Sequence, residues 1–236
     1  MTGWDESADA WIRKMGDHGD WSRVHVLDPA MLRHLDGRGI GTALDVGCGE
    51  GRFCRLLRQR GIAATGIDPT ARLIAAARQR DPEGTYAEGR AEALPFGDAQ
   101  FDLVVSYLSL VDTEDFRAAI AEMARVLRPG GTLLVANLSS MFSAGPAEGW
   151  IRDTEGRRSS FPIDRYMEER AQRVQFAGVD IVNWHRPLSA YMAAYLAAGL
   201  VLRAFEEPMP IGADSEATAA FRRVPWFVVM AWEKPG

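Results

Sequence analysis

Cysteine, long apolar runs and an excess of positive charge are all scarce or absent in this chain of 236 residues. Its two cysteines, Cys48 and Cys54, are too few for a disulfide framework and wrongly spaced for a zinc site. No apolar run reaches the length of about 18 residues that a membrane span needs, and the N-terminal residues lack the basic and apolar regions of a signal peptide. The formal net charge of −5 provides no basic field for nucleic acid. With 47% hydrophobic residues, we expect one cytoplasmic globular protein without a metal, a membrane span or a nucleic-acid partner.

The most informative stretch present is residues 43–53, which has the pattern of a buried strand, a glycine-rich bend and a helix start. Gly47, Gly49 and Gly51 remove Cβ atoms where the backbone turns sharply and approaches a ligand, and the N–H groups of the following helix then face that ligand. Asp45, at the strand end, points a carboxylate into the same crevice. The glycine spacing differs from the dinucleotide fingerprint, and this argues against NAD or FAD.

Further motifs follow at the ends of later elements. Asp68 and Pro69 end a second apolar strand about twenty residues after the first glycine, where a carboxylate can reach a ribose hydroxyl pair. The others are residues 89–96, 101–106 and 126–135. Together, over roughly residues 40 to 138, these motifs resemble the class I S-adenosylmethionine-dependent methyltransferases, in particular the small-molecule group that includes ubiquinone and menaquinone C-methyltransferases.

Alternating strands and helices predict an α/β fold with a parallel sheet and right-handed crossovers. The resemblance implies a Rossmann-like class I methyltransferase fold, a mainly parallel seven-stranded sheet of order 3-2-1-4-5-7-6 with helices on both faces and an inserted lid. A final hairpin-like pair of strands predicts one antiparallel strand. Expected strands are 42–46, 63–67, 84–88, 101–106, 131–138, 201–206 and 226–232; expected helices are 4–16, 28–38, 51–60, 70–80, 114–127 and 188–198.

We expect a single methyltransferase domain over 1–236. It divides into an N-terminal helical flap (1–40), a cofactor-binding core (41–138), a lid insertion (139–184) and a C-terminal helix with strands (185–236). The insertion interleaves aromatic residues with arginines, and its place at the carboxyl edge of the sheet favours a lid that holds the acceptor. The alternative is that the aromatic residues only attach the insertion to the domain. Its residues 164–176 have apolar positions at helical spacing, which predicts a helix.

The resemblance also implies how S-adenosylmethionine is held. Asp45 and the backbone of Gly47 would bind the methionine part, Gly49 would allow close approach, and Asp68 would accept hydrogen bonds from both ribose hydroxyls. The remaining implied cofactor contacts are Pro69 in the second motif, Ala91 and Glu92 at the adenine, Ser106 beneath the methionine chain, and Arg23 in the flap near the methionine carboxylate. Asp45 can instead cap the loop, and Arg23 can instead be solvated.

Methyl transfer from a sulfonium is an in-line displacement, so the protein mainly aligns and desolvates the reactants and, for a weak acceptor, removes a proton. Tyr107 is placed to offer its ring or hydroxyl to the sulfonium methyl, although packing alone explains it as well. His185, where the insertion meets the next helix, is the best candidate for a general base because imidazole titrates near neutral pH. A structural role in holding the insertion is the alternative for His185.

The sequence therefore predicts an S-adenosylmethionine-dependent methyltransferase for a small-molecule acceptor, with S-adenosylhomocysteine as product. The acceptor atom, whether O, N or C, and the oligomeric state are not specified by these residues. The alternative function is a non-catalytic S-adenosylmethionine-binding module that acts through a protein partner. A turnover assay separates the two, because the fold alone does not decide function.

Overall fold

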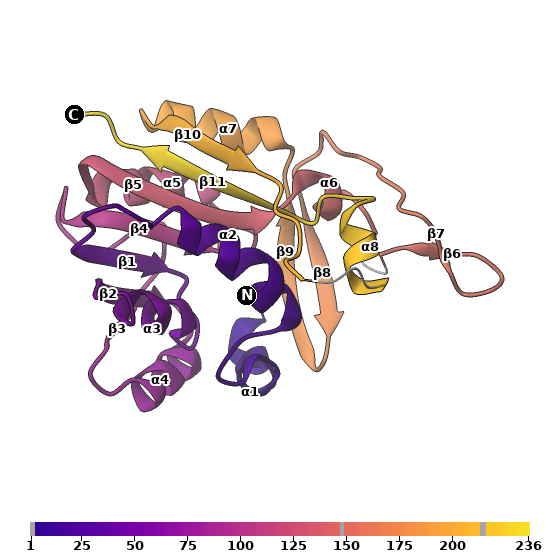
Figure 1. The fold of residues 1–236 in the computed structure, drawn as a ribbon, viewed down its shortest axis with the longest axis horizontal. Coiled ribbons are helices and arrows are strands. Elements are labelled where there is room, and N and C mark those ends of the chain that lie inside the picture. The colour runs from indigo at the N-terminus through magenta and orange to yellow at the C-terminus, as the bar shows by residue number, and fades with distance from the viewer. Residues whose placement is uncertain (1–2, 147–148, 213–215) are drawn as a thin grey trace.

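The structure is a computed structural model, and it describes residues 3–146, 149–212 and 216–236. The predicted flap and insertion include residues 1–2 and 147–148, which lie outside the described residues. A seven-stranded sheet forms the centre of the molecule (Figure 1). Its strands are β1 (Thr42–Val46), β2 (Ala63–Asp68), β3 (Thr85–Glu88), β4 (Phe101–Tyr107), β5 (Leu127–Leu138), β10 (Val201–Glu206) and β11 (Phe227–Glu233).

The strand order is β10-β11-β5-β4-β1-β2-β3, which confirms the predicted order 3-2-1-4-5-7-6. The core strands pair in parallel, with Asp45 of β1 opposite Gly66 of β2 and Val105 of β4. The last strand, β11, is antiparallel to both β5 and β10, as the sequence predicted. Because the parallel strands end at one edge, the loops after β1 to β4 gather there.

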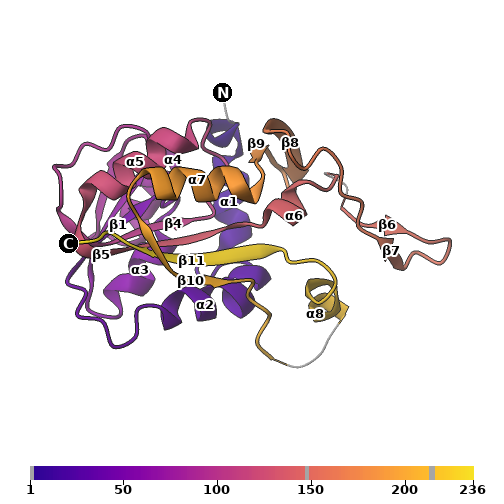
Figure 2. The same cartoon turned by 90° about the horizontal axis from the view of Figure 1, so that it is seen from above.

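The six expected helices lie close to their predicted positions. They are α1 (Trp4–Met15), α2 (Asp28–Arg33), α3 (Arg52–Arg58), α4 (Ala71–Arg80), α5 (Phe116–Val126) and α7 (Leu188–Ala197). The described residues also form the π-helix η1 (Arg23–Leu27), α6 (Ser140–Ser143) and α8 (Glu216–Phe221), which were not predicted. In Figure 2, α5 and α7 cover one face of the sheet, and α2 and α3 cover the other. The expected helix 28–38 ends earlier, at Arg33, and α8 lies within the connection of the final strand pair.

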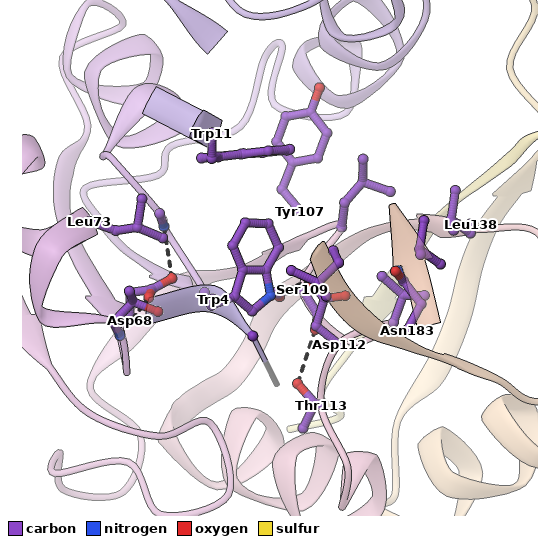
Figure 3. A pocket seen from close by; sticks show the side chains of 18 of the residues that line it. Trp4, Trp11, Asp68, Leu73, Tyr107, Ser109, Asp112, Thr113, Leu138 and Asn183 are labelled. Carbon is purple, nitrogen blue, oxygen red and sulfur yellow. Dashed lines mark hydrogen bonds between the residues drawn. The ribbon is translucent and has the colours of Figure 1, made fainter. Parts of the chain in front are cut away.

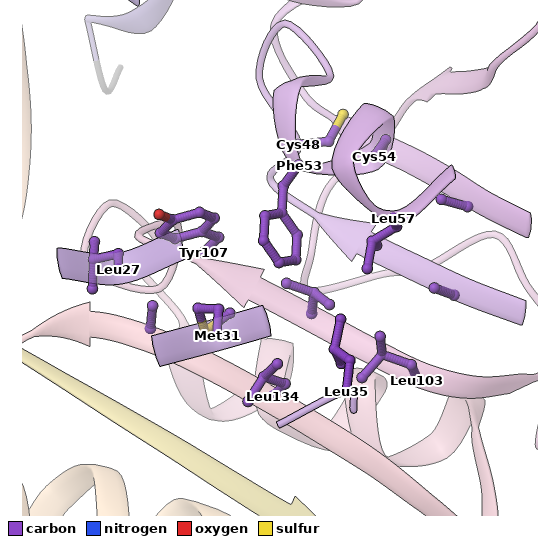
Figure 4. Packing of buried hydrophobic residues seen from close by; sticks show 14 of the residues in the cluster. Leu27, Met31, Leu35, Cys48, Phe53, Cys54, Leu57, Leu103, Tyr107 and Leu134 are labelled. Carbon is purple, nitrogen blue, oxygen red and sulfur yellow. The ribbon is translucent and has the colours of Figure 1, made fainter. Parts of the chain in front are cut away.

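The two faces of the sheet bury different sets of side chains. Consecutive residues alternate between them: Ala43 and Leu134 pack toward α2 and α3, whereas Leu44 and Leu133 pack toward α5 and α7. Figure 4 shows the first cluster, in which side chains from helices and strands meet, including Phe53, Leu57, Met31, Leu103 and Leu134. Full burial of each such side chain stabilises the fold by about 1.5–3 kcal/mol, and this packing fixes the loops at the carboxyl edge.

The insertion contains two antiparallel hairpins. One is formed by β6 (Ile151–Arg152) and β7 (Arg158–Ser160), and it projects from the body of the molecule (Figure 1). The other is formed by β8 (Arg170–Phe176) and β9 (Val179–His185). The expected helix over 164–176 is therefore wrong, because β8 occupies most of it and alternates between half-buried and exposed side chains along its length.

The β8–β9 hairpin packs against α1. Ala10 of α1 forms a small apolar cluster with Val179 and Ile181 of β9, with Trp4 and Trp11 packed beside it. No helix in the described part of the chain is long and apolar enough to cross a membrane. The N-terminal helix and the hairpin thus form one cover beside the carboxyl edge of the sheet.

Candidate functional site

A cavity of about 940 Å³ opens at the carboxyl edge of the sheet. Its walls come from the loops after β1 to β4, from α1 and from the β8–β9 hairpin. Figure 3 shows Asp68 on one side of the cavity and Asn183 on the other, with Trp4 and Trp11 reaching in from α1. Sites for small ligands usually enclose about 300–1,000 Å³, so this cavity is large enough for a cofactor together with an acceptor.

The glycine bend after β1 is held in a conformation that requires glycine. Gly47 has φ +76, and a Cβ atom there would overlap the Cβ of Ser109. The Gly47 N–H donates to the carbonyl of Ile67 on β2 at 2.8 Å, which fixes the loop to the neighbouring strand. Gly49 also has a left-handed backbone, with φ +55, and both glycines line the cavity.

Asp68 links the glycine bend to the end of β2. Its Oδ2 accepts a hydrogen bond from the Gly49 N–H at 3.0 Å, and its Oδ1 accepts one from the Thr70 N–H at 2.9 Å. The side chain is almost fully buried, and burial raises its pKa although both N–H donors oppose that shift. The carboxylate is therefore held in one orientation at the cavity wall, where it can accept further hydrogen bonds.

Asp45 is buried beneath the same bend. Its exposed fraction is 1%, and burial raises its pKa to about 7, against the opposing hydrogen bond from Cys54. The Cys54 thiol lies 3.5 Å from Oδ2, whereas Oδ1 has no hydrogen-bond partner in the described structure. A buried carboxylate oxygen left unpaired at a cavity is costly, and a cationic ligand group would compensate it.

The predicted adenine end of the cavity lies beyond β2 and β3. Pro69, Ala91 and Glu92 line it, together with the apolar side chain of Leu73. The Arg90 guanidinium donates to the Glu92 carboxylate at 2.8 Å and forms an ion pair with it.

Tyr107 and Arg23 lie on the opposite wall. The Tyr107 hydroxyl donates to Asp28 at 2.8 Å, and burial raises its pKa well above the usual value. Arg52 also pairs with Asp28, at 2.6 Å. Arg23 pairs with Asp20 at 3.0 Å, and its guanidinium lies 5.7 Å from the centre of the Tyr107 ring. The Tyr107 hydroxyl is thus engaged in a structural network, and the aromatic ring is the part available to the cavity.

The structure does not bring Ser106 to the cavity. Its side chain is fully buried, and its Oγ lies 2.8 Å from the Oγ of Ser109, which donates in turn to the carbonyl of Val46 at 2.7 Å. Ser109 lines the cavity in its place. Leu108, directly after β4, has φ +56, and the hydroxyl residue that lines the cavity follows it at Ser109.

His185 is also outside the cavity lining. It is fully buried, and both ring nitrogens are engaged: Nδ1 with the Ser143 hydroxyl at 2.9 Å and Nε2 with the Tyr166 carbonyl at 2.8 Å. Burial lowers its pKa. These contacts fit the structural alternative, in which His185 attaches the insertion to the core, and they leave no ring nitrogen for an acceptor proton.

Several lining residues were not identified from the sequence. Asp112, in the loop after β4, accepts a hydrogen bond from the Trp4 indole at 3.2 Å, and burial raises its pKa to about 8. Asn183 of β9 lines the same region. Asp45 and Asp68 lie at strand ends, which is the signal that identified them, whereas Asp112 lies five residues beyond the end of β4 and lacks it. Asn183 and Trp4 depend on contacts between distant segments. The described residues contain no cluster of three or more His, Cys, Asp or Glu that could hold a metal ion.

Comparison with known proteins agrees with this geometry. Residues 44–135 match the family described as "Methyltransferase domain". The chain is 36% identical over 111 residues to a malonyl-acyl-carrier-protein O-methyltransferase of Enterobacter lignolyticus, covering 47% of this chain and 44% of that protein. It is 38% identical over 109 residues to the protein of the same name from Salmonella typhimurium, covering 46% and 43%. The chain thus spans less than half the length of these curated relatives.

The solved structures extend the likeness to most of the chain. The structure of an S-adenosylmethionine dependent methyltransferase from Mesorhizobium loti superposes with a TM-score of 0.76 and 29% identity, covering 87% of this chain and 96% of that one. The fold of most of the chain therefore belongs to a known architecture. Over residues 44–135 this chain carries the methyltransferase domain, within the Rossmann-like fold of the class I S-adenosylmethionine-dependent methyltransferases.

Proposed function

We propose that this protein transfers a methyl group from S-adenosylmethionine to a small-molecule acceptor by in-line displacement. The observation that carries the proposal is the Asp68 carboxylate, fixed by the N–H groups of Gly49 and Thr70 beside a glycine bend and facing a cavity of about 940 Å³. The cofactor would supply an electrophilic methyl group on a positively charged sulfur. The residues of the chain bind, orient and exclude water around it.

The lining residues fit this cofactor. The unpaired Oδ1 of Asp45 would accept from the ammonium of the methionine part, and the Gly47 bend, where a Cβ is excluded, allows close approach. Asp68 would accept from the ribose hydroxyls. Pro69, Ala91 and Glu92 would contact the adenine, and Arg23 would lie near the methionine carboxylate. Ser109 replaces Ser106 in this assignment.

The catalytic contribution of the chain is mainly alignment. The Tyr107 ring would face the cationic methyl group, where an aromatic face stabilises positive charge. We assign His185 to positioning the insertion rather than to proton transfer, because both its ring nitrogens are engaged. The acceptor would enter beneath the β8–β9 hairpin and α1.

The acceptor is a separate question. The curated relatives named above are O-methyltransferases of malonyl-acyl-carrier protein, whereas the motifs alone suggested a likeness to ubiquinone and menaquinone C-methyltransferases. Because the matches span less than half of those relatives, a malonyl thioester is one acceptor to be tested beside quinols, phenols and amines.

The ribose contact gives a direct test. The Asp68→Asn change leaves one acceptor oxygen and places an N–H group against a backbone donor, so we expect cofactor affinity to fall by about 1.5–3 kcal/mol. Calorimetry with S-adenosylmethionine and S-adenosylhomocysteine measures it. The control is Asp17→Asn, which makes the same change at an exposed side chain outside the cavity. Unchanged affinity in a folded Asp68→Asn protein would contradict the cofactor assignment.

Turnover separates an enzyme from a silent binding module. Release of S-adenosylhomocysteine is followed with wild-type protein and the acceptor panel. Binding of the cofactor without turnover of any acceptor would favour the non-catalytic module, which acts through a protein partner.

A further inference from the structure

Two residues that line the cavity from different elements each carry a buried acceptor oxygen without a partner among the described residues. The Trp184 N–H of β9 donates to the Val111 carbonyl at 2.7 Å, so Asp112 and Asn183 are the immediate neighbours of a hydrogen-bonded pair. Both side chains line the cavity, and Figure 3 shows them together at the end away from Asp68. The Oδ1 atom of each is buried without a hydrogen-bond partner in the described structure. Such a pair is suited to a ligand that donates hydrogen bonds.

The loop that carries Asp112 is held firmly. The buried guanidinium of Arg186 donates to the carbonyls of Leu110 at 3.0 Å and Glu114 at 2.8 Å, and also to that of Thr113. These bonds fix the backbone on both sides of Asp112. A group held in this way is oriented before the ligand arrives.

The charges around the cavity favour a cationic ligand. Carboxylates outnumber arginines and lysines among the lining residues. The Asp112 carboxylate accepts one hydrogen bond, from the Trp4 indole at 3.2 Å, and forms no ion pair with any described residue. The lining arginines already have carboxylate partners: Arg23 with Asp20 at 3.0 Å, Arg52 with Asp28 at 2.6 Å and Arg90 with Glu92 at 2.8 Å. An anionic acceptor would find no unpaired arginine among the described lining residues to neutralise it beside Asp112, which is unfavourable in a buried site.

We infer that Asp112 and Asn183 bind the nitrogen of an amine acceptor, and that the protein is an N-methyltransferase of apolar amines. This inference rests on the proposed function. The indole of Trp4 presents its N–H edge to Asp112, and its ring centre is 5.1 Å from that of Trp11, so apolar aromatic surface lies next to the nitrogen site. Such surface accommodates the apolar substituent of an amine.

The reaction balances with these residues. The N–H bond of the bound ammonium breaks, and its proton passes to the Asp112 carboxylate, which leaves a lone pair on nitrogen. That lone pair forms the new C–N bond as the bond between sulfur and the methyl carbon breaks, and the electron pair of the broken bond stays on sulfur. The positive charge moves from sulfur to the methylated nitrogen, and Asp112 returns its proton to solvent.

Calorimetry on the complex with S-adenosylhomocysteine tests the inference without relying on turnover. The probes are 2-phenylethylamine, N-methyl-2-phenylethylamine, 4-ethylphenol, 3-phenylpropionate and a malonyl thioester. We expect the amines to bind most tightly. Asp112→Asn should weaken amine binding by about tenfold or more, the equivalent of one charge-assisted hydrogen bond, and Asn183→Leu should weaken it by a smaller factor. Asp17→Asn is the matched control.

The outcomes separate this inference from the proposed function. Loss of amine binding in Asp112→Asn, with S-adenosylhomocysteine affinity retained, supports it, and N-methylated product from wild-type protein completes the case. The amine site is wrong if the phenol, the carboxylate or the malonyl thioester binds more tightly than both amines. It is also wrong if both variants bind amines as tightly as wild type does. In either case the proposed methyltransferase function stands. Failure of wild-type protein to bind S-adenosylhomocysteine rejects the proposed function itself. If Asp112→Asn does not fold, amine binding by Asn183→Leu still tests the inference.

Discussion

Glycine at position 47 is required both by the backbone and by the neighbouring side chain. Its φ of +76 lies in the left-handed region, and the space for a Cβ is filled by Ser109. Such local requirements explain why Asp45, Gly47 and Asp68 could be identified from the sequence: each belongs to a short motif at a strand end. Asn183 could not, because its place at the cavity depends on pairing between β8 and β9, far along the chain.

Substitution of Gly47 by alanine can separate the cost of backbone strain from the cost of steric overlap with Ser109. Gly47→Ala should lower the free energy of unfolding by the left-handed strain, about 1–2 kcal/mol, plus an overpacking cost of about 1–3 kcal/mol. Gly61→Ala is the matched control, because Gly61 has φ +78 and an added Cβ there would have no other atom within 4 Å, so it carries only the strain. Urea denaturation of both variants measures the difference. Equal losses would show that the loop relaxes around the added methyl group.

Asp112 makes stability depend on pH. Burial raises its pKa to about 8, the charge of Asp68 adds to this, and the Trp4 indole, Arg23 and Arg186 oppose it. The folded pKa lies above the unfolded value, so the stability from this group is fully present at low pH and is lost as the pH rises from the ordinary carboxyl range through 8.

Removal of that ionisation should therefore stabilise the unliganded protein in alkaline solution. One pKa unit corresponds to about 1.4 kcal/mol. We subtract the free energy of unfolding of wild type from that of Asp112→Asn at each pH. This difference should be larger at about pH 9 than at about pH 5 by at least about 1 kcal/mol. Thermal unfolding across this range measures it, with Asp17→Asn as reference. A gain that is the same at both pH values would show that Asp112 does not titrate in the folded state.

At the scale of elements, the sequence predicted the sheet well and the insertion poorly. The core strands and helices carry buried faces that are set by nearby residues, and their ends fall within a few residues of those expected. In the stretch 164–176, Met167, Ala171 and Val174 suggest a helix, but only the partner strand decides the outcome. Val174 pairs with Ile181, and the apolar face they share packs on α1. A helical period in a short segment was therefore overruled by contacts outside it.

His185 lies at the end of the same hairpin, where the insertion meets α7. From the sequence alone, it could be either a general base or a residue that attaches the insertion to the core. The structure places Ser143 and the Tyr166 carbonyl at its two nitrogens, so it joins α6, the loop before β8 and the end of β9. Residue type alone does not distinguish these roles, because an imidazole serves both.

At the scale of the whole molecule, α1 and the β8–β9 hairpin form one cover over the cavity although they are far apart in sequence. Ser7 is almost fully buried between them. Its Oγ donates to the Asp180 carbonyl at 3.1 Å and accepts from the Asp180 N–H at 2.9 Å. Both contribute cavity-lining residues, Trp4 and Asn183 among them, so we expect acceptor access to depend on the two moving together.

Hydrogen exchange tests this coupling. In wild-type protein, S-adenosylhomocysteine should protect the amides of α1 and of β8–β9 together, because opening one exposes the other. Ser7→Ala leaves both backbone groups of Asp180 without that partner, at a cost of about 1–3 kcal/mol for the buried pair, and exchange should rise in both elements while the central sheet stays protected. Ser160→Ala, at an exposed position of β7, should change neither. If α1 exchanges faster in Ser7→Ala while the hairpin keeps its wild-type protection, the two elements open independently, and the acceptor then needs only one of them to move.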